Sequence, residues 1–219
     1  MYPNVLDGTE NETLDVDKSL DTTPKFLLKK ETTSATDRGT ATHVFLQFCK
    51  FDRLKDQGVD NELDILIKDG FIPEEYRGLI DKSRVQFFTK HWLFNDMLNA
   101  KEGEIWREFR FNVMLSAHDL SIDPNIQKEM VLVQGVIDCV FKKGEDYILV
   151  DYKTDNATVD EIVGKYTSQL NYYARACKKL FGKPVKEAYI YSIKNCSVGR
   201  VPLTDVDDGE YNPPVRPTK

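Results

Sequence analysis

The chain contains few cysteines, and none of them is placed in a metal-binding pair. The four cysteines among 219 residues stand at positions 49, 139, 177 and 196, with no C-x-x-C spacing. Zinc and iron–sulfur sites need close-set thiolate ligands, so we expect no iron–sulfur cluster. The cysteines lie within apolar periodic segments, and we predict free buried thiols in a reducing cytoplasm.

Three other patterns are missing from the sequence. No apolar run reaches the roughly 20 residues that cross a membrane, so no membrane partner is expected. Residues 1–24 are acidic and polar, unlike the basic and then apolar pattern of a secretory signal. The phosphate-binding pattern G-x-x-x-x-G-K-[ST] is absent, which excludes an ATP motor of that kind within these residues. We predict a cytoplasmic protein.

Basic residues are also fewer than acidic residues. The net charge is −6, with 30 basic and 36 acidic residues. This balance argues against a tight, dedicated nucleic-acid binder, which is typically basic. It does not exclude a nuclease, because a bound metal ion inverts the local field at an acidic site.

Length and composition suit one medium-sized domain. The hydrophobic share is 41% and the charged share 30%, ordinary values for a globular protein. We predict a flexible lead-in at 1–24, a folded domain at 25–204 and a tail at 205–219. The two polar ends suggest a piece of a longer polypeptide.

The most informative stretch runs from Gln134 to Lys153, QGVIDCVFKKGEDYILVDYK. It predicts a hairpin of two strands around a short polar linker with a glycine. Asp138, Asp151 and Lys153 fall near the strand centres, where Asp is depleted and costly to bury without a cation. A divalent metal would neutralise them, and the set Asp…Asp-x-Lys is a minimal kit for metal-assisted phosphodiester cleavage. The alternative is a hairpin with charges facing solvent.

Alternation of side chains along a strand decides whether the two acids meet. Asp151 and Lys153 are expected to share a face with Tyr147 and Leu149. Asp138 is expected to share a face of its own strand with Val136 and Val140. In one of the two parity classes of register, Asp138 and Asp151 face the same side, roughly 4.5–8 Å apart. One ion then reaches both carboxylates.

Residues Thr36–Lys50 predict a helix with an apolar stripe: Ala41, Val44, Phe45, Phe48 and Cys49. Gly39 and His43 lie together on the other face. His43 is either solvated or a nitrogen ligand for a metal in a cleft. Gly39 would let another backbone approach closely.

The other segments complete an α/β pattern. Residues 61–100 predict a helical cap with an aromatic-rich packing face: Phe87, Phe88, Trp92, Leu93, Met97 and Leu98. Ile105–Leu115 predicts a strand with Ile105, Arg107, Phe109, Phe111 and Val113 on one face, and Trp106, Glu108 and Arg110 on the other. Glu108 is a further acid near the metal or an ion-pair partner of a neighbouring arginine.

A helix is predicted from a capping box at Thr158 and Glu161 to about Phe181, with Gly164 delaying its regular start. Gln169 and Tyr173 are adjacent on its surface, and the Gln169 amide is free to bond a metal ligand or a phosphate. Short strands at 188–193 and 198–201 complete the sheet.

Together these pieces form an ordered series: Gly39-x-x-x-His43, Gly135-Val-Ile-Asp138, Asp151-Tyr-Lys153 and Gln169-x-x-x-Tyr173. The series resembles the RecB-like branch of the PD-(D/E)xK nuclease superfamily. Its order and spacing are most similar to the nuclease domains of the AddA family of helicase–nuclease proteins.

The resemblance implies a restriction-endonuclease-like core, in which helices flank a mixed sheet. It implies one Mg2+ or Mn2+ held by His43, Asp138, Asp151 and the Tyr152 carbonyl, with Lys153 as the catalytic lysine. Gln169 and Tyr173 would support the site and touch DNA. Relatives with a clustered set of cysteines hold an iron–sulfur cluster, and the lack of that set here favours AddA over its partner AddB.

The function predicted from the sequence is that of a metal-dependent DNA nuclease domain in a helicase–nuclease that repairs double-strand breaks. Its expected partners are DNA, the helicase motor domains and an AddB-like protein. Two alternatives remain: a catalytically inactive nuclease-fold module for DNA binding or assembly, and a stand-alone restriction-like endonuclease. The second alternative calls for a basic DNA-binding surface, of which the composition offers little.

Overall fold

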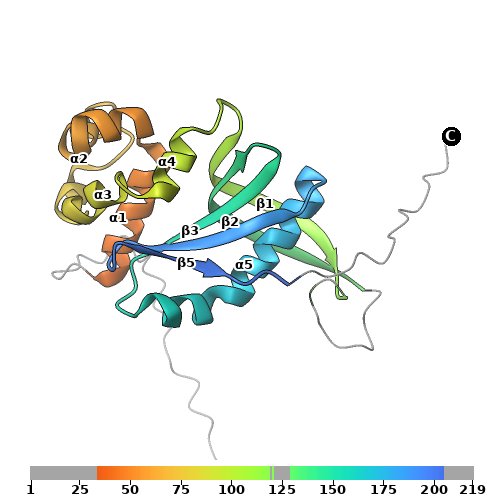
Figure 1. Cartoon of the computed structure of the whole chain (residues 1–219). Helices are drawn as coiled ribbons and strands as arrows, with labels where there is room; N and C mark the ends of the chain where they lie inside the picture. Colours follow the sequence, from red (N-terminus) through yellow and green to blue (C-terminus); the bar gives the residue numbers. More distant parts are fainter. Residues whose placement is uncertain (1–33, 119, 121–128, 205–219) are drawn as a thin grey trace, which may run out of the picture. The chain divides into compact units, whose positions relative to one another are not determined.

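The computed structural model describes residues 34–118, 120 and 129–204, all within one structural unit (Figure 1). The predicted lead-in and tail lie outside the described residues. Across the described part of the chain, no helix combines the length and the apolar character needed to cross a membrane.

A five-stranded mixed sheet forms the centre of the unit, in the order β1-β2-β3-β4-β5. Its strands are β1 (Ile105–Ser116), β2 (Met130–Lys143), β3 (Asp146–Lys153), β4 (Val185–Ser192) and β5 (Ser197–Val201). All neighbours are antiparallel except β3 and β4, which run parallel. The predicted hairpin is confirmed, since β2 and β3 pair around the turn at Gly144.

The parallel pair needs a crossover, and α5 (Val159–Phe181) supplies it across one face of the sheet (Figure 1). The capping box of Thr158 and Glu161 is present, and Gly182 ends the helix in the left-handed conformation. The helix begins at Val159, so Gly164 does not delay its start. Every member of its apolar stripe belongs to the core beneath it: Tyr166, Leu170, Tyr173, Ala174, Cys177 and Phe181.

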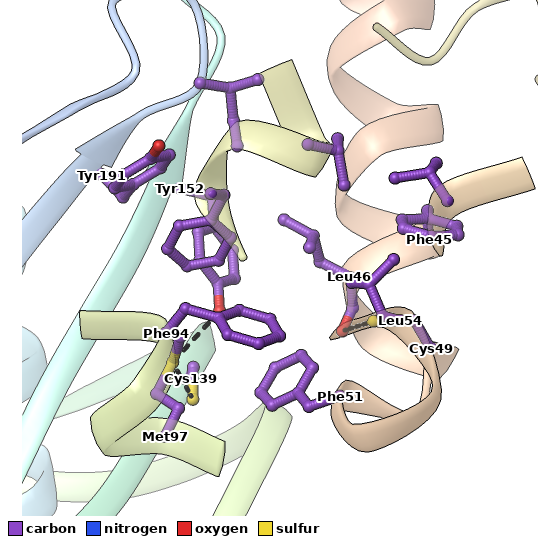
Figure 2. Close-up of a cluster of buried hydrophobic side chains, with 14 of the residues drawn as sticks. Phe45, Leu46, Cys49, Phe51, Leu54, Phe94, Met97, Cys139, Tyr152 and Tyr191 are labelled. Carbon is purple, nitrogen blue, oxygen red and sulfur yellow. Dashed lines mark hydrogen bonds between the residues drawn. The ribbon is translucent and has the colours of Figure 1, made fainter. Parts of the chain in front are cut away.

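The N-terminal helices form a second, larger core on the opposite face, confirming the predicted helical cap. They are α1 (Ala35–Phe48), α2 (Phe51–Lys68), the 3-10 helix η2 (Glu74–Gly78), α3 (Lys82–Phe88) and α4 (Trp92–Leu98). Figure 2 shows aromatic rings from both the cap and the sheet meeting there, including Phe51, Phe94, Tyr152 and Tyr191. Each such ring, once buried, contributes about 1.5–3 kcal/mol to stability.

Three residues of the predicted packing stripes are partly exposed instead. Phe48, Phe87 and Trp92 expose 36%, 52% and 44% of their surface. In α1, Leu46 is buried at the core while Phe48 lies at its edge against Phe71. Periodicity fixes the direction of a stripe but not its width, which depends on how far the neighbouring helices extend.

The predicted faces of β1 are wrong for the first part of that strand. Ile105 and Arg107 face the cap, whereas Phe109 and Phe111 face α5. The alternation inverts at Glu108, whose φ of 49° is left-handed rather than extended. Alternation in the sequence predicts which face a side chain occupies only where the strand is regular. One residue in another conformation moves every later side chain of the strand to the opposite face.

The same inversion occurs in β2, because the two strands stay in register on both sides of it. Arg107 pairs with Cys139 and Phe109 with Ile137. Val136 is therefore exposed while Val140 is packed under α5, which corrects the prediction that they share a face. The irregular step falls at Glu108 and Asp138, which lie across from each other.

Candidate metal and catalytic site

Asp138 is the centre of the candidate site. Its Oδ1 lies 3.1 Å from His43 Nδ1, joining α1 to β2, and its Oδ2 accepts a 2.7 Å hydrogen bond from the Tyr152 N–H. The regular β2–β3 ladder ends at the pair Cys139–Val150, so the next step places Asp138 across from Asp151. The helix, the central strand and the end of β3 thus converge on one carboxylate.

Glu108 joins this group. His43, Glu108 and Asp138 each offer a ligand atom, and these atoms all lie within 4.8 Å of one another. The left-handed backbone of Glu108 is the local feature that accompanies this placement. Strain of this kind persists where the surrounding structure fixes it, and such positions cluster at functional sites.

Asp151 and Lys153 form a second part of the site, at the end of β3. Lys153 Nζ lies 2.5 Å from Asp151 Oδ2 and 4.3 Å from the centre of the Tyr166 ring on α5. The Tyr166 hydroxyl is itself held by Asp155 at 3.1 Å. Both side chains are largely buried, and the Lys153 ammonium is the counter-charge of Asp151 Oδ2. Asp151 is not one of the three residues whose ligand atoms are clustered.

The ionisation of the site reflects crowded negative charge. Burial, followed by the charge of Asp138, raises the pKa of Asp151 to about 6, although Lys153 opposes the shift. Burial and Asp138 likewise raise the pKa of Glu108. For His43, burial lowers the pKa, but the hydrogen bond and charge of Asp138 outweigh it and the net pKa is raised. Raised carboxyl pKa values beside a raised imidazole pKa indicate a site that attracts positive charge.

The remaining predicted residues lie around this centre. A Cβ on Gly39 would lie 3.0 Å from Thr154 Oγ1, so the close neighbour is a side chain rather than the predicted backbone. Gln169 donates a 2.7 Å hydrogen bond to the Tyr173 hydroxyl. The Tyr152 side chain is buried in the cap, with its hydroxyl on Met97 Sδ, so only its main chain faces the site.

Comparison with known proteins identifies the family of this chain. A family model described as the PD-(D/E)XK nuclease superfamily matches residues 17–213, most of the chain. The chain belongs to the PD-(D/E)XK nuclease superfamily. The mixed sheet with flanking helices is accordingly the restriction-endonuclease-like fold that the motif series predicted.

Several curated relatives are named as the A subunit of an ATP-dependent helicase/nuclease. One from Clostridium botulinum (strain Alaska E43 / Type E3) is 36% identical over 195 residues, covering 85% of this chain and 15% of the relative. One from Alkaliphilus metalliredigens is 33% identical with the same two coverages, and one from Desulforamulus reducens is 35% identical over 78% of this chain. The chain spans about 15% of the length of the curated relatives it matches.

The residues present fit the divalent metal that PD-(D/E)XK nucleases use. The donor set is one imidazole and carboxylate oxygens, which suits Mg2+ or Mn2+ better than zinc. The carboxylate of Asp151, whose buried Oδ2 faces the Lys153 ammonium, is a further source of oxygen ligands next to this group. The four cysteines are free, and none belongs to the ligand group found among the described residues.

Gly135 of the PD-(D/E)XK motif series has a packing role that the sequence did not reveal. A Cβ there would lie 2.8 Å from Phe111 and 2.9 Å from Tyr173. The absence of a side chain lets Tyr173 reach the sheet, where its hydroxyl accepts the hydrogen bond from Gln169.

Glu108 is the other residue whose position at the site depended on the fold, since the sequence of a strand does not reveal which residue adopts a left-handed conformation.

Replacing Gly135 with alanine should destabilise the domain by about 1–3 kcal/mol, because the two rings must shift to admit a methyl group. Thermal unfolding should show a melting temperature about 3–10 °C lower. Gly164 is the matched control: it lies inside α5 with open space where a Cβ would stand, so Gly164→Ala should stabilise the helix slightly. Equal melting temperatures for both variants would contradict the packing argument.

Proposed function

We propose that this chain is the Mg2+-dependent deoxyribonuclease domain of a helicase–nuclease that acts in double-strand break repair and hydrolyses phosphodiester bonds of a single strand. One observation carries the proposal: His43, Glu108 and Asp138 gather their ligand atoms beside the Asp151–Lys153 pair. The helicase/nuclease names of the relatives support the setting, with motor domains and an AddB-like protein as partners. The cytoplasmic location stays a prediction.

His43, Glu108, Asp138 and Asp151 would hold the metal, with the Tyr152 carbonyl as the further ligand that the family pattern implies. When bound, Mg2+ supplies a Lewis acid for a phosphoryl oxygen and lowers the pKa of a water molecule. Asp138 also orders the site, because its two oxygens engage His43 and the Tyr152 N–H. These acids serve as ligands rather than as an acid–base pair.

Lys153 would stabilise the charge that develops on the phosphoryl group or orient the attacking water. The Tyr166 ring beneath its ammonium and the Asp151 carboxylate beside it hold the side chain at the site. Burial lowers the pKa of Lys153, but the charge and hydrogen bond of Asp151 and the charge of Asp138 together outweigh burial, so the net pKa is raised and the lysine stays protonated. Gln169 and Tyr173 would support the site and contact DNA, while Gly39 leaves room for Thr154.

Mg2+ should stabilise the folded chain, because it binds the native site and not the unfolded polypeptide. At a concentration about tenfold above its dissociation constant the gain is about 1.4 kcal/mol, which raises the melting temperature by about 3–6 °C. Differential scanning fluorimetry with MgCl2 measures the shift, and NaCl at equal ionic strength is the control. Asp138→Asn should remove the Mg2+-specific part. Equal shifts with both salts would refute the metal site.

Cleavage assays then separate the three candidate functions. Incubation of single-stranded DNA with Mg2+ should give nucleotides or short fragments. An inactive module would show the thermal shift without cleavage. A stand-alone restriction-like enzyme would cut covalently closed duplex circles, which a nuclease served by a motor and acting on single strands leaves intact.

A further inference from the structure

Beyond the metal site, β1 and β2 continue as a two-stranded ribbon. Residues 130–137 of β2 lie outside its ladder with β3 and, among the described strands, pair with β1. One side of the ribbon is packed under α5 through Phe111, Val113 and Leu115. The other side is exposed and is termed the β-ribbon face: Arg110, Asn112 and Met114 of β1, with Met130, Leu132, Gln134 and Val136 of β2.

The β-ribbon face begins where the catalytic group ends. Arg110 pairs with Val136, one alternation beyond the opposed Glu108 and Asp138. Asn112 then pairs with Gln134, and Met114 with Leu132. A polymer lying along this face therefore leads directly to the candidate metal.

The charge of the β-ribbon face differs from that of the chain. None of its seven residues is acidic, although the chain carries 36 acids against 30 bases. Its one charge is Arg110, which makes no hydrogen bond or ion pair with any residue in the described ranges. Among the described residues Arg110 has only an electrostatic attraction to Glu108, without a direct contact, so its exposed guanidinium beside the proposed cleavage site suits a phosphate.

The other side chains suit bases rather than backbone. Met114, Met130, Leu132 and Val136 expose between 37% and 52% of their surface, and each can pack against the flat face of a base. The facing amides of Asn112 and Gln134 offer donors and acceptors to base edges of any sequence. This mixture fits a single strand, whose bases are open to contact, better than a duplex.

The size of the face also favours a strand over a protein. Residues 130–136 of β2 occupy seven consecutive positions at about 3.4 Å each, a length of about 24 Å, and two strands give a width of about 10 Å, hence about 240 Å2. A stable protein partner needs about 800 Å2 on each side. The face is too small for such a partner alone but accommodates several nucleotides.

We propose that the β-ribbon face binds the single-stranded DNA substrate next to the scissile bond, with Arg110 holding a phosphate and the apolar side chains supporting bases. The inference rests on the proposed nuclease function and adds where the DNA substrate lies as it approaches the metal site. It also accounts for the weak binding expected from an acidic chain, because one cation contributes one phosphate contact.

The test measures binding of a fluorescent 12-nucleotide single strand to the 219-residue chain in EDTA, where cleavage cannot occur. Arg110→Ala should raise the dissociation constant about five- to tenfold and reduce the salt slope by about 0.7. Leu132→Asp should raise it about tenfold by placing a charge among the bases. The matched controls are Lys68→Ala at the end of α2 and Leu180→Asp on α5, both at exposed positions and both expected to bind like the wild type.

Cleavage kinetics with Mg2+ separate this inference from the proposed function. Arg110→Ala and Leu132→Asp should raise KM more than they lower kcat, and melting temperatures confirm that the variants fold. If the wild type cleaves DNA and both variants keep its KM and its dissociation constant, the β-ribbon face does not bind the substrate and the inference is wrong. If the wild type binds in EDTA but never cleaves with Mg2+ or Mn2+, the proposed nuclease function fails while the binding face stands.

Discussion

Asp138→Asn and Asp151→Asn should each lower the rate of Mg2+-dependent DNA cleavage by at least about 10³-fold, or about 4 kcal/mol of transition-state stabilisation. Asparagine keeps the shape of the side chain but removes the negative charge that holds the metal. At Asp138 the amide oxygen still accepts from the Tyr152 N–H and the amide nitrogen faces His43, so the fold should persist. Initial rates on a labelled single strand measure the loss.

Asp146→Asn is the matched control for these variants. Asp146 begins the same strand whose end carries Asp151, and it makes a surface pair with Lys186. Its substitution should leave the rate within about twofold of the wild type, because surface ion pairs contribute little. Wild-type rates for both site variants would contradict the nuclease assignment.

Removing the charge of Lys153 should lower the rate by about 10²–10³-fold while leaving Mg2+ binding largely intact. Lys153→Met keeps an unbranched side chain of similar length and removes the ammonium that lies over the Tyr166 ring. The variant separates a role of Lys153 in metal binding from a role in the chemical step. Calorimetric titration measures the metal affinity, and single-turnover kinetics measure the rate of the chemical step. A normal rate at saturating Mg2+ with a collapsed affinity would show that Lys153 acts on the metal site instead.

Lys142→Met controls for the loss of a lysine over an aromatic ring. Lys142 Nζ lies 5.6 Å from the centre of the Tyr147 ring and 3.5 Å from Glu104. Lys142 thus has the same two kinds of neighbour as Lys153, a carboxylate and an aromatic ring, on the same hairpin but outside the candidate site. Its loss should affect neither the rate nor the metal affinity.

The two variant sets distinguish an active nuclease from a retained fold. A domain kept only for DNA binding gains nothing from Asp151, whose burial and neighbouring Asp138 disfavour its charged form. Asparagine at this position would relieve the repulsion from Asp138 but would leave the buried Lys153 ammonium without its carboxylate partner. A loss of catalysis in variants whose melting temperatures show that they still fold is therefore the pattern expected of an active site rather than of a retained fold.

The sequence alone predicted most of the helices and strands and indicated the chemistry proposed for this protein. Acids and a lysine inside apolar strands stand out because their burial requires a cation, and this signal is local. The hairpin, the capped crossover helix with its stripe and the helical cap likewise follow from periodicity and turn residues, which act within a few positions. The ordered motif series then led to the nuclease family.

Only the tertiary structure decided which side chains meet. The left-handed Glu108 inverts the faces of β1 and β2, so that Glu108 joins His43 and Asp138 while Arg110 begins the β-ribbon face. Alternation in the sequence does not reveal such a step, and the extent of exposure depends on where α1 and α5 stop covering the sheet. Close approaches such as that of Tyr173 to Gly135 are also contacts between distant segments, and these are fixed by packing rather than by local sequence.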